Sequence, residues 1–164
     1  AAPPRQRTYR DRVEIRPLDL DDPGTARAVL ALQRRAYRVE AEMVGSDAIP
    51  PLHESLDELR RSGERFAGAF VEERLTGVVS WKLVGETLDL HRLAVDPNAF
   101  RRGLGRALVL AALAAEPGAT RAVVQTGSRN EPACRLYRSL EFAPTGEREV
   151  APGLVISLFE RSLG

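Results

Sequence analysis

The sequence has little of what secreted, membrane-spanning or nucleic-acid-binding proteins depend on. It contains one cysteine, Cys134, which excludes an intrachain disulfide and is typical of a reducing compartment. Its longest apolar run, residues 107–115, is too short to cross a bilayer, so we expect no membrane partner. The 24 basic and 23 acidic residues leave a formal net charge of +1, which argues against nucleic acid as a partner. We therefore expect a cytoplasmic protein.

The first 12 residues differ from the remainder of the chain. They are rich in proline and arginine and contain no apolar stretch, so we expect no signal peptide there. We interpret residues 1–12 as a disordered leader or a remnant of cloning. With 43% hydrophobic residues, the chain can bury a core without disulfides or metal, and no repeat or linker divides it. The prediction is one domain over residues 13–164.

Apolar periodicity and turn residues predict alternating strands and helices. Asp19–Pro23 is typical of a helix N-terminus, and Ser55–Glu58 of a capping box. The predicted strands are residues 13–17, 66–71, 75–83, 87–95 and 121–126, with a final hairpin formed by Val150 and residues 154–159. The predicted helices begin near residues 23 and 55 and cover residues 104–115 and 132–140. This pattern predicts a single α/β domain.

One turn between a strand and a helix combines two glycines with three arginines. Gly103 and Gly105 allow the backbone to approach a ligand closely, and the following helix directs free N–H groups and its dipole toward that ligand. Arg101, Arg102 and Arg106 add positive charge. Such a turn predicts a phosphate-binding site, and the alternative is an ordinary turn with solvent-exposed arginines. It has neither the Gly-Lys-Ser/Thr ending of a P-loop nor the three spaced glycines of a dinucleotide-binding turn.

This turn resembles the pyrophosphate-binding turn of the GNAT superfamily, the acyl-CoA-dependent N-acyltransferases. The family pattern is Gln/Arg-x-x-Gly-x-Gly/Ala after a strand ending in Val-x-Pro, and this chain has Val95-Asp96-Pro97 and Gly103-Leu104-Gly105. Phe100 stands where the family has Gln or Arg, which puts side-chain roles there in doubt. Backbone amides do most of the phosphate binding in the family. The resemblance therefore implies a pyrophosphate site over Phe100, Arg101, Arg102, Gly103, Leu104, Gly105 and Arg106.

Residues 130–142 resemble the second hallmark of the family, Asn-x-x-Ala-x-x-Leu-Tyr-x-x-x-Gly-Phe. Asn130, Ala133, Tyr137 and Phe142 match this pattern, and Glu141 stands where glycine is usual. The two hallmarks together imply a mixed, largely antiparallel sheet of six to seven strands flanked by four helices, with splayed fourth and fifth strands. They also imply acetyl-CoA as co-substrate and no metal.

The resemblance places a candidate general base on the strand Thr87–Val95. Acyl transfer to an amine needs a group that removes the proton of the amine, and family members commonly place an acid on this strand. Counting back from Gly103 puts that acid at Asp89. Asp89, His91, Leu93 and Val95 alternate and are expected to share one face of the strand. His91 is a rival base because imidazole titrates closer to neutrality than a carboxyl, and a cross-strand pair or a surface contact is the alternative for each.

Tyr137 is the candidate general acid. In the family this tyrosine lies beside the coenzyme sulfur, where a neutral phenol carries the proton that the leaving thiolate needs. The alternative is an aromatic side chain that packs the helix onto the sheet. We expect Asn130 to cap the helix and to contact the pantetheine arm. Cys134 has no identifiable base partner, so we expect it to be a small buried apolar residue.

The resemblance further implies that the strand Thr87–Val95 bulges near Leu93–Val95 and splays from the next strand. Free N–H groups of Leu93, Ala94 and Val95 would then bind the thioester oxygen and the pantetheine amides. The coenzyme would lie between the two strands.

The acceptor is the least defined part of the prediction. The segment from Val39 to Glu58 contains no lysine or arginine and six acids, namely Glu40, Glu42, Asp47, Glu54, Asp57 and Glu58. An acidic wall would attract a cationic amine, although three of these acids also suit a helix N-terminus. We predict an N-acetyltransferase that acts on a primary amine of a small molecule or peptide, with a homodimer as its assembly. The alternative is a catalytically silent acyl-CoA-binding or regulatory domain.

Overall fold

The computed structural model describes residues 2–4, 8–9, 12–46, 49 and 52–164, and its centre is a seven-stranded sheet. The strand order is β1-β2-β3-β4-β5-β7-β6, and every neighbouring pair is antiparallel except β4 and β5, which are parallel. The strands are β1 (Val13–Leu18), β2 (Arg65–Val71), β3 (Arg74–Val84), β4 (Thr87–Val95), β5 (Arg121–Gly127), β6 (Ala143–Ala151) and β7 (Leu154–Ser162). This confirms the mixed, largely antiparallel sheet that the hallmarks imply.

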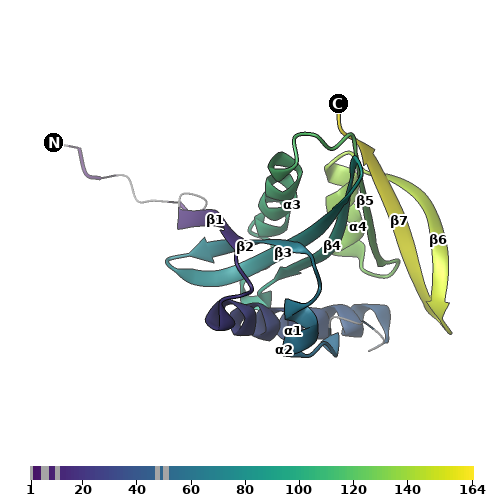
Figure 1. Ribbon diagram of the computed structural model, residues 1–164, viewed down its shortest axis with the longest axis horizontal. Coiled ribbons are helices and arrows are strands. Elements are labelled where there is room, and N and C mark those ends of the chain that lie inside the picture. The colour runs from purple at the N-terminus through teal and green to yellow at the C-terminus, as the bar shows by residue number, and fades with distance from the viewer. Residues whose placement is uncertain (1, 5–7, 10–11, 47–48, 50–51) are drawn as a thin grey trace.

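Helices cover both faces of the sheet (Figure 1). One face carries α1 (Pro23–Val44) and α2 (Leu56–Arg60), and the other carries α3 (Leu104–Ala115) and α4 (Glu131–Ser139). A core of buried apolar side chains fills each interface, with Val29 and Val78 on the α1 side and Leu88 and Leu108 on the α3 side. A short 3-10 helix, η3 (Pro97–Ala99), follows β4. The α/β fold with four α-helices is therefore confirmed in the described part of the chain.

Local sequence signals explain where three of the helices begin. The carboxylate of Asp22 accepts the N–H of Thr25, and Pro23 occupies the first turn of α1. The Ser55 hydroxyl accepts the N–H of Glu58, and the Asn130 side chain accepts the N–H of Ala133. Helix α3 differs, because its N-cap is Gly103 and no side chain caps its first N–H groups.

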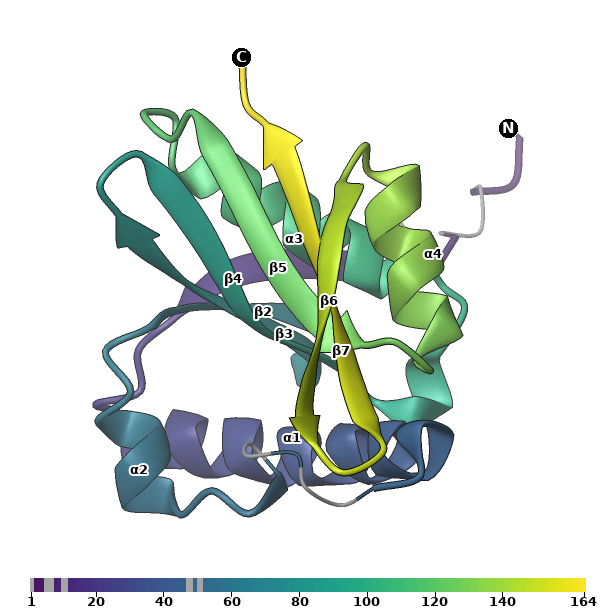
Figure 2. The same ribbon diagram turned by 90° about the vertical axis from the view of Figure 1, so that its right-hand side faces the viewer.

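Strands β4 and β5 separate along their length. They pair only from Thr87 to Leu90 on β4, whereas β5 goes on pairing with β7 as far as Gly127. On its other side β4 has a β-bulge, because Leu90 and Arg92 pair with adjacent residues of β3 and leave His91 as the extra residue. The predicted splay of the fourth and fifth strands is confirmed. Both strands lie above α1 (Figure 2), and we call the region between their separated ends the wedge.

The bulge corrects two predictions about β4. It lies at His91, whereas the resemblance implied a bulge near Leu93–Val95. Leu90 and Leu93 both pack into the core on the α3 side. Residues three apart in a regular strand would face opposite sides of the sheet. The intervening extra residue reverses the alternation, so Asp89 and His91 do not share a face with Leu93 and Val95, and that prediction was wrong. The predicted final hairpin was too short, because β6 begins at Ala143 and is exposed along nearly all its length.

Candidate active site

The N-terminus of α3 is open for an anion. Gly103 is the N-cap with φ of 78°, and no side chain caps the helix, in contrast to α1, α2 and α4. Arg101 also has positive φ, 64°, which a non-glycine residue rarely adopts and which is typical of functional loops. A Cβ atom on Gly105 would lie 3.2 Å from Cδ2 of Leu136, so this glycine permits close packing of α3 against α4. The free N–H groups and the helix dipole make this turn suitable for a phosphate.

A cavity of about 400 Å³ lies against this turn. It brings together nearly all the residues predicted to bind the coenzyme: Leu93, Ala94, Val95, Phe100, Arg101, Gly103, Leu104, Gly105, Arg106 and Asn130. Arg102 is the exception, since its guanidinium lies 4.6 Å from the ring centre of Tyr9 instead. Within this cavity the residues present fit an acyl-CoA pyrophosphate and the start of its pantetheine arm.

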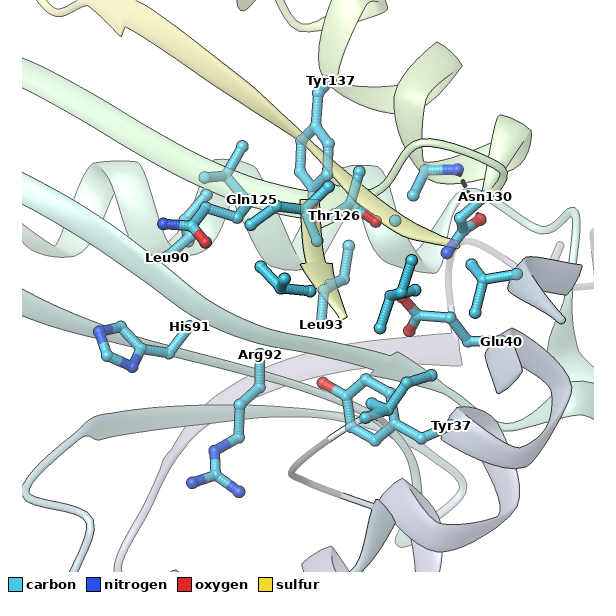
Figure 3. Close-up of a pocket in the computed structure, with 18 of the residues that line it drawn as sticks. Tyr37, Glu40, Leu90, His91, Arg92, Leu93, Gln125, Thr126, Asn130 and Tyr137 are labelled. Carbon is cyan, nitrogen blue, oxygen red and sulfur yellow. Dashed lines mark hydrogen bonds between the residues drawn. The ribbon is translucent and has the colours of Figure 1, made fainter. Parts of the chain in front are cut away.

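A second cavity of about 460 Å³ occupies the wedge between β4 and β5 and shares Tyr37, Glu40, Leu93, Asn130 and Ala133 with the first. Tyr137 enters it from α4, while Tyr37 and Glu40 enter from α1 on the opposite side (Figure 3). The two cavities therefore follow one another from the glycine turn to the interior of the wedge, with the shared residues between them.

Tyr137 is 4% exposed and packs against Phe142 and Phe159, with ring centres 5.7 and 5.9 Å away. Burial raises the pKa of its phenol, and the carboxylate of Glu40 raises it further. The phenol consequently keeps its proton at neutral pH, as a general acid requires. The same packing also satisfies the alternative role of an aromatic anchor for α4.

Asp89 and His91 form a pair at one end of the wedge. Nε2 of His91 lies 3.2 Å from Oδ2 of Asp89, and Nδ1 lies 3.9 Å from Oε2 of Glu64. His91 lines the wedge cavity, but its ring points away from Tyr137 (Figure 3). Asp89 is not among the described residues that line either cavity. Both rival bases thus lie together, although at the edge of the cavity.

Arg92 anchors a buried ionic network that the sequence analysis missed. Its guanidinium is hydrogen-bonded to Glu54 at 2.5 and 2.9 Å, to Glu64 at 2.8 and 2.9 Å, and to Gln33 at 3.0 Å. Burial alone would raise the pKa of Glu64, but hydrogen bonds from Arg92 and Ser80 and the charge of Arg92 hold it below the ordinary value. The network joins α1, through Gln33, and the loops before and after α2, through Glu54 and Glu64, to β4 next to the bulge, so it holds one wall of the wedge in place.

Glu40 and Tyr37 were also missed as individual site residues. Glu40 was only one of six acids in the predicted acidic wall, whereas the structure turns its carboxyl into the cavity beside Asn130 (Figure 3). Burial raises the pKa of Glu40, and a hydrogen bond from Asn130 opposes that rise. The Tyr37 hydroxyl hydrogen-bonds the backbone of Leu93, and burial raises its pKa. Of the other acids, Glu42 is exposed, Glu54 binds Arg92, and Asp47 lies outside the described residues.

Cys134 is buried, its Sγ contacts the Gly127 carbonyl oxygen, and burial raises the pKa of its thiol. An inert packing role follows for this side chain. Across the described ranges, no group of three or more His, Cys, Asp or Glu side chains is placed to hold a metal ion. No helix in those ranges is long and apolar enough to cross a membrane.

Comparisons with known proteins agree with this geometry. The model of the acetyltransferase (GNAT) family matches residues 27–142. UPF0157 protein YqkA of Bacillus subtilis (strain 168) is 38% identical over 134 residues, which are 82% of this chain and 39% of that protein. The chain thus spans about two fifths of the length of this curated relative.

Two solved structures show the same fold at low sequence identity. The ribosomal-protein-S18-alanine N-acetyltransferase from Escherichia coli has a TM-score of 0.74 and 20% identity over 92% of this chain and 93% of its own. The PaiA N-acetyltransferase from Thermoplasma acidophilum, solved in complex with coenzyme A, has a TM-score of 0.71 and 18% identity over 92% and 99%.

Proposed function

Because the chain belongs to the GNAT acetyltransferase family, we propose that it transfers an acetyl group from acetyl-CoA to a primary amine of a small molecule or peptide. The observation that carries the proposal is the succession of two cavities from the uncapped N-terminus of α3 to Tyr137. The first cavity suits a pyrophosphate, and the second suits a thioester and its acceptor.

In this proposal, acetyl-CoA binds with its pyrophosphate at the N–H groups of residues 103–106. Alternate N–H groups of a strand point to opposite edges. The N–H of Asp96 bonds Thr76 of β3, so the N–H of Ala94 also faces β3, and only Leu93 and Val95 face the edge that β5 leaves free. The Leu93 backbone bonds the Tyr37 hydroxyl, so in this proposal the N–H of Val95 polarises the thioester carbonyl. The amine attacks the carbonyl carbon directly, the carbon–sulfur bond breaks, and Tyr137 protonates the departing thiolate. No metal takes part.

The amine must lose a proton before or during the attack, and Asp89 and His91 are the candidate bases on β4. Their mutual contact of 3.2 Å suits a pair in which the carboxylate orients the imidazole. Replacing the true base should slow turnover by about 10²–10⁴-fold while coenzyme binding is retained. The rate constants of the Asp89→Asn and His91→Asn variants test this assignment.

The second candidate function is a catalytically silent acyl-CoA-binding or regulatory domain. It is favoured by the position of Asp89 and His91 at the edge of the cavity, away from Tyr137. Incubation of the purified protein with acetyl-CoA and a panel of amines separates the two functions, because only an enzyme releases free thiol in an amine-dependent way. The cytoplasmic location and the homodimer stay predictions.

A further inference from the structure

Glu40 occupies a position that no other carboxylate in the described part of the chain shares. Of the described residues that line the two cavities, it is the one acidic side chain, and it lines both. It lies on α1, one turn after Tyr37, and faces the wedge on the side opposite Tyr137 (Figure 3). A general base has to contact the space in which the amine reacts, and Glu40 meets that condition where Asp89 does not.

The carboxylate of Glu40 has a polar neighbour but no cationic partner among the described side chains. Its hydrogen-bond partner is the neutral Asn130, and no ion pair within the described ranges involves it. By contrast, Glu54 and Glu64 are both bound to Arg92. A part-buried carboxylate without a countercharge favours a bound cation or a proton, and the ammonium form of an acceptor supplies both.

We propose that Glu40, on helix α1, is the general base that takes the proton from the acceptor amine. The inference rests on the proposed acetyl transfer and changes the element that supplies the base. Glu40 removes one proton from the ammonium and later releases it to solvent. The nitrogen lone pair forms the bond to the carbonyl carbon, and the carbon–sulfur bond breaks with its electron pair on sulfur. Tyr137 protonates the sulfur, and the second N–H proton of the adduct restores the phenol.

The titration of Glu40 should appear in the pH–rate profile. Burial raises its pKa, so the deprotonated, active form is lost on acidification at a higher pH than for an ordinary carboxyl. The other ionisable groups that line the two cavities are Tyr37, His91, Arg92, Arg101, Arg106, Tyr137 and Arg148. Among these residue types only histidine has an ordinary pKa near neutrality, so the profile of a His91→Asn variant separates any contribution of that residue.

The test compares Glu40→Gln with Glu42→Gln, a matched change on the same helix at an exposed side chain outside both cavities. Acetyl-CoA and each amine that the wild type acetylates are the probes. We expect Glu40→Gln to lower kcat by about 100-fold or more, to remove the acid limb of the profile, and to leave the Kd of CoA within about threefold. Glu40→Asp should recover part of the loss, and Glu42→Gln should match the wild type.

Three outcomes overturn the inference. In the first, Glu40→Gln keeps the kcat of the wild type. In the second, Glu40→Gln raises only the KM of acetyl-CoA. In the third, only Asp89→Asn or His91→Asn loses activity. In each of these the wild type still acetylates amines, so the proposed function survives. If the wild type acetylates no amine, both the proposed function and the assignment of Glu40 as its base are wrong.

Unfolding provides a readout that does not depend on catalysis. A carboxyl whose pKa is raised in the folded state contributes stability that is present below its unfolded pKa and lost as pH rises through its folded pKa. Glu40→Gln should therefore resist urea better than the wild type at pH 8, with the advantage shrinking toward pH 4. An advantage that does not depend on pH would contradict the burial of an ionised Glu40.

Discussion

Replacing Arg92 by methionine should destabilise the fold more than any exposed ion-pair change. The Arg92 side chain is 5% exposed, and its partners Glu54 and Glu64 are 14% and 6% exposed. Removing one partner of a buried ion pair costs about 3–5 kcal/mol, because the remaining charge is left buried and unpaired. In a domain of this size that loss lowers Tm by about 6–20 °C. Methionine keeps much of the volume, so lost packing contributes little to the effect.

The size of this loss should depend on pH. In the wild type the pKa of Glu64 lies below its ordinary value, so the group contributes stability that is present above its unfolded pKa and lost as pH falls. Without Arg92, burial should raise that pKa instead and reverse the sign of the contribution. The difference in free energy of unfolding between wild type and Arg92→Met should therefore be largest near pH 7 and shrink as pH falls below about 4.5.

Urea unfolding followed by far-UV circular dichroism at pH 7 and pH 4 measures both effects. Arg12→Met is the control, because Arg12 forms an exposed ion pair with Glu72 at 3.0 Å and such pairs contribute about 0–1 kcal/mol. A loss below about 1 kcal/mol for Arg92→Met, or one that is equal at both pH values, would refute the assignment of this network as a buried, ionised anchor.

Three further substitutions test other parts of the account. Tyr137→Phe keeps the ring that packs on Phe142 and Phe159 and removes only the hydroxyl, so turnover should fall by about tenfold or more with CoA binding retained; turnover within twofold of wild type would exclude Tyr137 from the mechanism. Gly103→Val places a β-branched residue at a φ of 78° and should abolish CoA binding in calorimetry; unchanged affinity would move the pyrophosphate site elsewhere. Glu141 has a φ of 67° at the position where the family has glycine, so Glu141→Gly should raise the free energy of unfolding by about 1 kcal/mol in urea titration. A lower stability for that variant would show that the left-handed backbone at Glu141 carries no strain.

Most of the fold could be predicted from the sequence, because its elements have strong local signals. The bounds predicted for the strand at residues 87–95 and the helix at residues 104–115 match β4 and α3. Strand β6 was predicted only at its end. Its Ala143–Ala151 segment is exposed along nearly all its length, so no apolar alternation marks it.

The site could be predicted where the glycine turn or the second hallmark marks it, and Asn130 and Tyr137 of that hallmark line the wedge cavity. Gly103 and Gly105 identify the turn because their conformations and packing demand glycine. The Arg92 network and the inward orientation of Glu40 depend on contacts between segments far apart in sequence, such as Arg92 with Glu54. The resemblance predicted a bulge in β4, but its position at His91 could not be predicted, because a bulge is a mismatch between two strands and has no marker in either one alone.

Amine-dependent release of free thiol from acetyl-CoA tests the central claim most directly. The wild type should release thiol with at least one primary amine of the panel, and mass spectrometry should find that amine acetylated in equal amount. Tyr137→Phe should bind CoA as tightly as the wild type and release thiol at least about tenfold more slowly. A wild type that binds CoA but releases no thiol above the amine-free rate, with any amine, would contradict the account and leave a silent acyl-CoA-binding domain.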